Sequence, residues 1–269
     1  MGLKIVTWNM KCGGSPEAWD YLLDLKPHVA LLQEAVIPEG IKDQYIVFHR
    51  SALSKSGRNQ PWGSAVVVDR RLRATGVELT PRARPWISIG LEKFGGSFIA
   101  ADVAMPQGNV FFLSCHSPAW NLPVAECGIS KAAQDEIRGS ASPNDIWGTD
   151  FIWEYLRDEL VGDRQFVVGG DFNCSIIFDD TWGSGNQEFI DSMASLGLVD
   201  CVRKYRPDPR STPTFKNPKG GKVEHQLDYL WMTEGMAALL RNCEVGSREI
   251  FERKLSDHLP IIASLGLKS

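Results

Sequence analysis

The 269-residue sequence lacks long apolar runs, closely paired cysteines and a strong excess of charge of either sign. No apolar run approaches the ~20 residues that a membrane-spanning helix requires, so no membrane segment is expected. The chain enters a β-like run, Leu3 to Trp8, almost at once, which leaves no room for the apolar core of a signal peptide. We therefore expect a cytoplasmic protein.

The six cysteines are scattered, and no Cys-x-x-Cys pair occurs among them. Several lie inside apolar runs, where a thiol behaves as a small hydrophobic side chain. We therefore expect reduced cysteines at Cys12, Cys115, Cys127, Cys174, Cys201 and Cys243.

The balance of charges gives the chain no general attraction to a polyanion. Its formal net charge is −4, with 43% apolar and 23% charged residues, as in an ordinary globular protein. Binding of nucleic acid or of another phosphate ester must then rely on a local basic patch and on metal ions.

No repeat or linker divides the chain, so a single domain over residues 1–269 is expected.

Recurrent β-branched runs and a few punctuated helices indicate a mixed α/β sandwich. Helices are predicted from Pro16, with Ser15 as the N-cap, from Thr149 to Gly162, and from about Asn186 to Gly197. The runs at 97–104 and 110–115 predict a hairpin, so the sheet cannot be purely parallel. The predicted strands cover 4–8, 29–33, 64–68, 97–104, 110–115, 165–168, 226–232 and 261–265.

Three carboxylates stand where such runs end or begin: Glu34, Asp171 and Asp228. Residues at strand ends can meet at one rim of a sheet, and carboxylate oxygens suit a hard divalent cation. A Glu just past a strand is more often solvated, however, and the Gly-Gly before Asp171 also suits a plain turn. The pattern of each acid alone leaves both readings open.

The pair Asp257-His258 precedes the last apolar run. Asp228 lies within an otherwise apolar strand and needs a polar partner, for which His258 is the obvious candidate. That pairing would give an acid-oriented imidazole, although a lone His near a strand is more often structural.

Asn9 and His116 follow two other β-like runs and add an amide and an imidazole at comparable positions. Either could be a satisfied turn residue. Six such polar sites, all of a type that handles metal or phosphate, favour a metal-assisted enzyme that cleaves phosphodiesters.

A basic stretch between Arg203 and Lys222 carries Tyr205 and Phe215 among its cations. Such a stretch could hold phosphates and stack bases, and a solvated surface loop is the alternative. The irregular segment from Pro118 to Gly148, with Trp120 and Trp147 near its ends, is expected to influence substrate selectivity.

Six short motifs, taken in their order along the chain, resemble those of the endonuclease/exonuclease/phosphatase superfamily of DNase I-like and exonuclease III-like enzymes. Thr214-Phe215 also stands where that family often has Thr-Trp. The resemblance spans nearly the whole chain through Thr7-Trp8-Asn9-Met10, Leu32-Gln33-Glu34, Ser114-Cys115-His116, Gly170-Asp171-Phe172-Asn173, Leu227-Asp228-Tyr229 and Ser256-Asp257-His258-Leu259-Pro260-Ile261.

The resemblance implies a four-layer α/β sandwich, in which two mixed β-sheets are flanked by helices. It implies that Glu34 binds Mg²⁺ or Mn²⁺, with Asp257 and Asn9 completing the metal site. It further implies that Asp171, helped by Asn173, positions or deprotonates the attacking water.

His258, oriented by Asp228, is implied to hold the scissile phosphate or to transfer a proton. His116 is implied to donate to a phosphate oxygen or to the leaving group. Substrate contacts are expected at Arg203, Arg206, Thr214 and Phe215.

Met10-Lys11-Cys12 stands where apurinic endonucleases usually have an acid, which argues against specialisation for abasic sites. The leading hypothesis is a nuclease acting on DNA or RNA. The alternatives are a phosphatase or phosphodiesterase acting on a small phosphoester (a nucleotide, an inositol phosphate or a lipid headgroup), and a catalytically idle scaffold that keeps the fold. The sequence makes no prediction of the oligomeric state.

Overall fold

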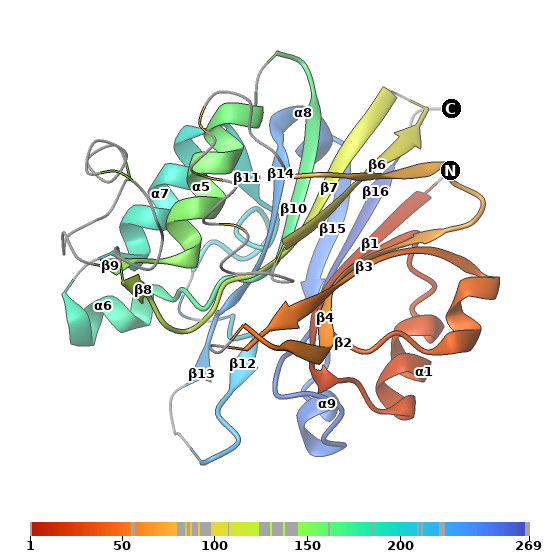
Figure 1. Cartoon of the computed structure of the whole chain (residues 1–269), viewed down its shortest axis with the longest axis horizontal. Coiled ribbons are helices and arrows are strands. Elements are labelled where there is room, and N and C mark those ends of the chain that lie inside the picture. The colour runs from red at the N-terminus through yellow and green to blue at the C-terminus, as the bar shows by residue number, and fades with distance from the viewer. Residues whose placement is uncertain are drawn as a thin grey trace.

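The structure is a computed structural model, and its strands form two six-stranded sheets (Figure 1). It describes residues 2–266 apart from 55–56, 80–83, 85–86, 88–90, 92–97, 107, 124–129, 131–136, 138–144, 161, 184, 209, 211 and 221–223. The first sheet has the order β15 (Leu240–Val245), β16 (Ile261–Gly266), β1 (Gly2–Gly13), β2 (Val29–Ala35), β4 (Asn59–Asp69) and β3 (Tyr45–Leu53). The second has the order β11 (Leu198–Asp200), β14 (Asp228–Thr233), β10 (Gln165–Asp171), β7 (Gly108–His116), β6 (Phe98–Met105) and β5 (Ala74–Val77).

Both sheets are mixed, as predicted. β1 pairs with β2 and β10 pairs with β7 in parallel, whereas their other neighbours are antiparallel. The predicted hairpin is confirmed as β6 and β7, although Ser97 lies outside the described residues. Two short ribbons, β8 (Leu122–Pro123) with β9 (Asp145–Ile146) and β12 (Phe215–Lys216) with β13 (Glu224–His225), complete the strands of the described ranges.

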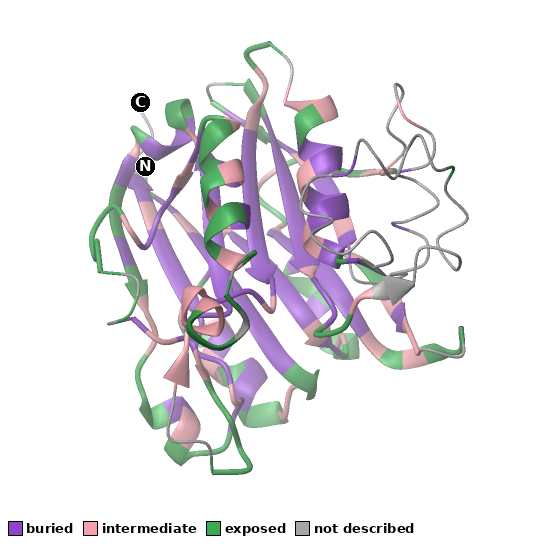
Figure 2. Cartoon of the chain, turned by 90° about the vertical axis from the view of Figure 1, so that its left-hand side faces the viewer, coloured by how far each residue is buried: buried purple, intermediate pink, exposed green. Residues whose placement is uncertain are grey.

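Helices cover the outer face of each sheet, which gives the expected four layers (Figures 1 and 2). On the first sheet Val6 and Trp8 pack against Trp19 and Leu22. On the second sheet Phe111, Phe166 and Trp231 pack against apolar side chains of two helices. The helices are α1 (Pro16–Asp24), the 3-10 turn η1 (Glu39–Asp43), α5 (Gly148–Glu159), α6 (Ile176–Trp182), α7 (Asn186–Ser195), α8 (Glu234–Ala237) and α9 (Glu249–Glu252).

The first predicted helix starts where its capping signals place it. The Ser15 hydroxyl accepts a hydrogen bond from the Ala18 amide at 3.2 Å, and Pro16 opens α1. This side-chain acceptor satisfies one of the amides that a helix start leaves without a partner. The second predicted helix begins one residue earlier than expected, at Gly148.

Two expectations from composition can be compared with the described residues. No helix among them is long and apolar enough to cross a membrane. Cys12, Cys115, Cys174, Cys201 and Cys243 are all free, as expected for reduced thiols, and Cys127 lies outside the described ranges.

The side chains between the two sheets change from apolar to polar towards one end. Along β1 the alternate positions that face the second sheet run from Leu3 and Ile5 to Thr7 and Asn9. Thr7 and Asn9 are buried, so their polar groups need partners inside the protein. At this end of the sandwich the facing side chains of the two sheets, Thr7 and Asn9 among them, therefore form a buried polar layer, which we call the polar floor.

Gln33 and Ser114 connect the sheets within that floor. Gln33 Nε2 donates to Ser114 Oγ at 3.0 Å, and Ser114 Oγ donates to the Leu32 carbonyl at 2.9 Å. Gly169 lies beside them without a side chain, and a Cβ there would come within 2.9 Å of Leu31 Cδ1. The sheets consequently approach closely at the end that carries the candidate site.

We expect Gly170→Ala to destabilise the protein strongly. Gly170 has a φ of +155°, and a Cβ at this position would overlap the Cys115 carbonyl group on the neighbouring strand. Neither backbone can give way within a sheet, so the free energy of unfolding should fall by about 3 kcal/mol or more in urea unfolding experiments. Gly40→Ala is the control, because a Cβ there meets nothing within 4 Å. An equal, small effect of both substitutions would contradict this account of the packing.

Candidate active site

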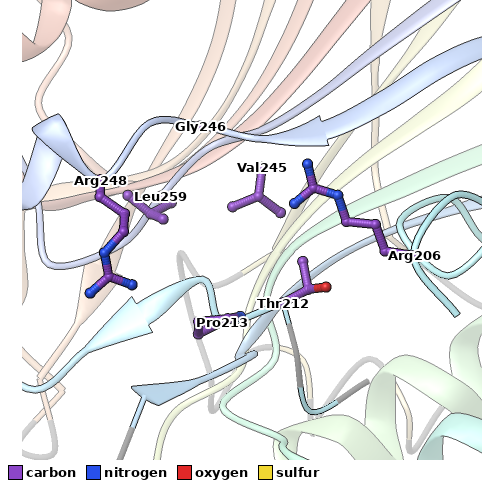
Figure 3. A pocket seen from close by; sticks show the side chains of 7 residues that line it. All are labelled: Arg206, Thr212, Pro213, Val245, Gly246, Arg248 and Leu259. Atoms are coloured by element: carbon purple, nitrogen blue, oxygen red, sulfur yellow. The ribbon is translucent and has the colours of Figure 1, made fainter. Parts of the chain in front are cut away.

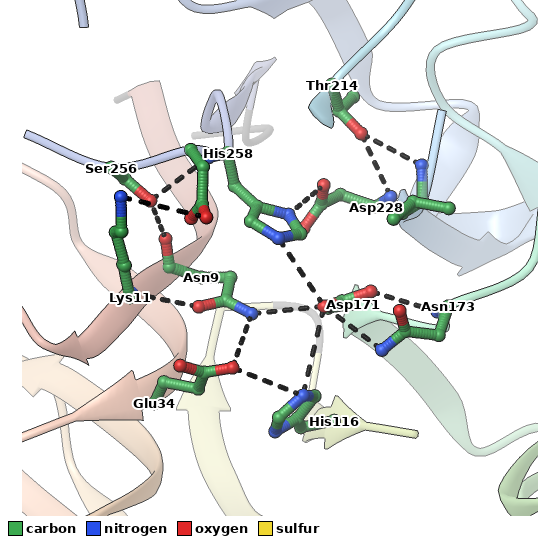
Figure 4. Close-up of polar contacts among 12 residues, drawn as sticks. Asn9, Lys11, Glu34, His116, Asp171, Asn173, Thr214, Asp228, Ser256 and His258 are labelled. Carbon is green, nitrogen blue, oxygen red and sulfur yellow. Dashed lines mark hydrogen bonds and ion pairs between the residues drawn. The ribbon is translucent and has the colours of Figure 1, made fainter. Parts of the chain in front are cut away.

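Five strand ends bring the predicted polar residues together (Figure 4). Asn9 and Glu34 lie towards the carboxyl ends of β1 and β2 in the first sheet. In the second sheet Asp171 ends β10, and its register partners are His116 at the end of β7 and Asp228 at the start of β14. Because β14 runs antiparallel to β10, its first residue reaches the same edge.

Asn9 joins the carboxylates of the two sheets. Its Nδ2 atom lies 3.0 Å from Asp171 Oδ2 and 3.4 Å from Glu34 Oε1. His116 Nε2 lies 3.5 Å from Glu34 Oε1 and 3.8 Å from Asp171 Oδ2. The predicted residues Asn9, Glu34, His116 and Asp171 thus surround one point between the sheets.

The predicted pairing of Asp228 with His258 is present. His258 Nδ1 lies 2.8 Å from Asp228 Oδ2, and His258 Nε2 lies 3.7 Å from Asp171 Oδ2. All three side chains are buried. The imidazole is therefore held by one carboxylate and directed towards the other, as an oriented acid or base requires.

Asn173 holds the second carboxylate oxygen of Asp171. Its backbone amide donates to Asp171 Oδ1 at 2.9 Å, while its side-chain Nδ2 donates to the Ser117 carbonyl at 2.8 Å. Asn173 has a φ of +47°, a conformation that Asn tolerates better than most residues. The predicted supporting role of Asn173 has this geometric basis.

The segment that carries His258 is fixed to the first sheet by two hydrogen bonds. Ser256 Oγ donates to the Asn9 carbonyl at 2.8 Å, and Trp8 Nε1 donates to the His258 carbonyl at 2.9 Å. Phe215 covers the imidazole of His258, with 4.8 Å between the ring centroids. Phe215 therefore lies at the site, and its contact with substrate stays a prediction.

A backbone irregularity gives Glu34 its position. Alternate residues of β2 face the second sheet at Val29, Leu31 and Gln33, so an ideal strand would turn Glu34 towards the outer helices. Instead Glu34 has a φ of +50°, and the pairing between β1 and β2 shifts after Asn9. The β-bulge therefore redirects the carboxylate towards the cluster.

Lys11 and Cys12 form the β1 side of this bulge, with φ values of +49° and +54°. The Cys12 amide and thiol both donate to Glu34 Oε2, at 2.8 and 3.0 Å. Residues of this kind in a left-handed conformation often accompany functional sites. Neither residue is predicted from the sequence as part of the site; the adjacent pair Gly13-Gly14 marks an irregular strand end but does not show the geometry of the bulge.

The charges of the cluster shift three pKa values. Burial raises the pKa of Glu34, but the nearby His116 and the hydrogen bonds from Cys12 outweigh burial, and the pKa is lowered. Burial, assisted by the charge of Asp228, raises the pKa of Asp171 despite the nearby imidazoles. Burial alone would lower the pKa of His258, yet Asp228 and Asp171 raise it to about 10. Because of this raised pKa, His258 is protonated between the two carboxylates at neutral pH.

Asp257 lies at the edge of this cluster. Its Oδ2 atom lies 3.8 Å from Lys11 Nζ, and its carbonyl accepts a hydrogen bond from the Lys216 amide at 3.0 Å. Burial, the hydrogen bond with Glu34 and the charges of Glu34 and Asp257 raise the pKa of the Cys12 thiol. Its predicted role as a metal ligand stays a prediction.

Two of the predicted substrate contacts make structural hydrogen bonds. Thr214 is fully buried, and its hydroxyl accepts hydrogen bonds from the amides of Leu227 and Asp228, each at 3.0 Å. It positions Asp228 and has no surface for a substrate. Arg203 donates to the carbonyls of Arg206 and Asp208 in its own segment, and its contact with substrate stays a prediction.

Arg206 lies away from the polar cluster, on a cavity of about 190 Å³. Its guanidinium extends towards Val245 (Figure 3). None of the residues that line this cavity belongs to the cluster, so contact of Arg206 with substrate stays a prediction. The lining residues are Arg206, Thr212, Pro213, Val245, Gly246, Arg248 and Leu259.

The cluster contains a group that could hold a metal ion. One potential ligand atom from each of Asp171, Asp228 and His258 lies within 4.8 Å of the others, the one such group of three found in the described part of the chain. Glu34 adds a carboxylate with an open side, since its Oε1 has only the long contacts to Asn9 and His116. Carboxylate oxygens make up most of the ligand atoms of the group of three and all of those of Glu34, and such oxygens suit a hard divalent cation.

The sequence profile of the endonuclease/exonuclease/phosphatase family matches residues 6–258, which include every residue of the polar cluster. The chain belongs to this family. Its members are metal-dependent phosphoesterases, and the chain is accordingly assigned as an enzyme rather than as an idle scaffold. Among curated protein sequences, none matches this chain.

Solved structures confirm the DNase I-like fold. An AP endonuclease from Archaeoglobus fulgidus is similar with a TM-score of 0.66 and 19% identity, over 98% of this chain and all of that one. The 3' phosphatase NExo from Neisseria, bound to a product DNA hairpin, has a TM-score of 0.61 and 17% identity over 98% and 100% of the chains. The AP endonuclease from Leishmania major has a TM-score of 0.64 and 15% identity over 99% and 88%.

We expect His258 to keep its proton at pH 8 in the metal-free protein. Its pKa of about 10 lies above the ordinary value of 6.5, so its stabilising effect is complete below pH 6.5 and is lost as the pH rises through about 10. Asp228→Asn removes the paired charge and should bring this pKa back towards 6.5. Nitrogen-edited NMR of the imidazole measures both values. His49, whose pKa is lowered by burial, is the internal control; titration of wild-type His258 near pH 6.5 would contradict the prediction.

Proposed function

We propose that this protein is a divalent-metal-dependent phosphodiester hydrolase that cleaves DNA or RNA. The convergence of Asp171, His258 and Glu34 on one point between the sheets carries the proposal. Hydrolysis of a phosphodiester needs a base for water, a cation for the phosphate and a proton donor for the leaving oxygen. The cluster offers a residue for each of these tasks.

Asp171 is the proposed base. Its pKa is raised, chiefly by burial, which brings a carboxylate closer to the proton affinity that a general base requires. The hydrogen bonds from Asn9 and Asn173 fix both carboxylate oxygens in place. A water held against Asp171 would therefore attack from a defined direction.

His258 is the proposed cation for the phosphate. It is protonated between Asp228 and Asp171, so it can donate from Nε2 to a phosphate oxygen. His116 Nε2 lies on the opposite side of Asp171 and is the proposed donor to the leaving oxygen. Asp228 keeps the His258 ring in one orientation and touches no substrate.

Glu34 is the proposed principal metal ligand, with Asn9 and Asp257 in support. His258 Nδ1 is occupied by Asp228, and protonation of the ring further disfavours a cation among Asp171, Asp228 and His258. Glu34 instead combines a lowered pKa with an open oxygen. When bound, Mg²⁺ or Mn²⁺ would neutralise negative charge that develops on the phosphate oxygens.

A polynucleotide is favoured as substrate by the residues beside His258. Phe215 contacts the imidazole, and two lysines are exposed nearby, Lys216 beside it on β12 and Lys219 in the turn that follows. An aromatic ring next to exposed lysines suits a strand of phosphates and bases.

The five free cysteines of the described ranges agree with the proposed cytoplasmic location.

We expect Asp171→Asn to lower the rate of hydrolysis by about 100-fold or more, because the amide cannot accept a proton from water. The measurement is cleavage of supercoiled plasmid, single-stranded DNA, RNA and bis-p-nitrophenyl phosphate with Mg²⁺, Mn²⁺ or EDTA. Asp20→Asn, an exposed acid on α1, is the control and should leave the rate unchanged.

Cleavage of a polynucleotide that requires metal and disappears with Asp171→Asn would support the nuclease. Hydrolysis of the small ester alone would instead indicate a phosphatase or phosphodiesterase acting on a small phosphoester. A full rate for Asp171→Asn on every substrate would refute the role of Asp171.

A further inference from the structure

Two tryptophans are unusually exposed on this protein. Trp120 is 40% exposed and Trp147 is 45% exposed, although Trp is normally among the most buried large side chains. Exposing an indole forgoes a large gain in hydrophobic stabilisation. Two such exposed aromatic side chains therefore point to a ligand.

Both tryptophans lie at one end of the β8–β9 ribbon. The ribbon pairs Leu122 with Ile146 in antiparallel register. Trp120 precedes Leu122 by two residues, and Trp147 follows Ile146 directly. In an antiparallel pair the start of one strand adjoins the end of the other, so the two residues share this end of the ribbon, near the start of α5 (Figure 1).

That end of the ribbon is attached to the wall of the active site through Ser117. The Ser117 amide donates to the Asp171 carbonyl at 2.8 Å, and its carbonyl accepts from Asn173 Nδ2, also at 2.8 Å. Gly148, next to Trp147, packs so tightly against Ser117 that a Cβ there would lie 2.6 Å from Ser117 Oγ. The tryptophans consequently stand beside the residues that hold the proposed base.

The backbone at Trp147 is fixed while its ring is exposed. The Trp147 amide donates to Asp150 Oδ2 at 2.8 Å and so closes the first turn of α5. Phe151, Ile152 and Tyr155 anchor that helix in the core. A ring on such a rigid base loses little conformational freedom when a ligand stacks on it.

We propose that Trp120 and Trp147 form a stacking platform for an unpaired nucleobase of the substrate. The proposal rests on the nuclease function proposed above and names the substrate class as single-stranded or frayed nucleic acid. Every base offers a flat π face to an indole, which makes such stacking tolerant of sequence. Bases inside a duplex are already stacked on their neighbours on both faces, so the platform favours an unpaired base at a single strand or a frayed end.

Tyr21 provides the comparison. It is half-buried on α1, which covers the outer face of the first sheet, and its ring lies edge-on to Trp8 with 5.7 Å between the ring centroids. The tryptophan platform is attached to the second sheet. Substitution of Tyr21 thus removes an aromatic side chain away from the platform and from the basic segment.

The experiment measures binding of a fluorescein-labelled single-stranded oligonucleotide by anisotropy in EDTA, where no cleavage occurs. We expect Trp147→Ala to weaken binding by about 5- to 100-fold, the usual range for one stacked base, and Trp120→Ala to act in the same direction. Trp147→Phe should retain most of the affinity because it keeps a ring. Tyr21→Ala should change affinity less than about 2-fold. Unchanged binding by Trp147→Ala, or an equal loss with Tyr21→Ala, would overturn the platform.

An oligonucleotide whose bases are replaced by abasic sites separates stacking from contact with phosphates. The wild type should bind this ligand at least as weakly as Trp147→Ala binds the normal oligonucleotide, because the contacts of both rings are lost, and the substitution should then have no further effect. A further loss with Trp147→Ala on the abasic ligand would mean that Trp147 acts through the backbone or the fold, which overturns stacking. Circular dichroism of each variant identifies any loss of fold, and Trp147→Phe keeps the test decisive in that case.

Cleavage assays with Mg²⁺ distinguish this proposal from the proposed function. Binding that depends on Trp147 without any cleavage by the wild type would refute the nuclease and leave the platform standing. Cleavage of single strands with normal binding by Trp147→Ala would refute the platform alone. Absence of any wild-type binding to single strands would also overturn the platform.

Discussion

The hydrogen bond from Asn9 Nδ2 to Asp171 Oδ2 joins the two sheets where their facing side chains become polar. A carboxylate buried as deeply as Asp171 is costly unless hydrogen bonds and opposite charge compensate it. Asn9, Asn173 and the two imidazoles provide that compensation from both sheets. The catalytic geometry is thus a property of how the sheets pack, since separating them would leave buried charge without partners.

Local strain accompanies this packing at the rim of the site. Glu34, Lys11, Cys12 and Asn173 all adopt positive φ values, although none is glycine. Such conformations cost on the order of 1–3 kcal/mol each and persist where surrounding contacts enforce them. Here the hydrogen bonds from Cys12 to Glu34 and from Asn173 to Asp171 enforce these conformations. The strain at the bulge places the Glu34 carboxylate where a regular strand would not.

The sequence predicted the strand ends better than the details of the site. The β-branched runs and the Ser15-Pro16 signal located strands and helices because hydrophobic periodicity and capping are local properties. Half-exposed edge strands such as β3 escaped notice, since their pattern lacks a buried face. Glu34 was identified by its residue type and position, but its orientation depends on a bulge that no pattern revealed. Thr214 was assigned to the substrate because residue type does not show burial.

The most direct test of the account is the position of Mn²⁺ in crystals of the protein, located by anomalous diffraction. The account places the ion on Glu34, with Asn9 or Asp257 nearby, and leaves Asp171 and His258 free to act on water and on the phosphate. The predicted result is one anomalous peak within coordination distance of a Glu34 oxygen, about 2.0 to 2.6 Å for a hard cation. A peak bound only by Asp171, Asp228 and His258, with Glu34 unliganded, would contradict it.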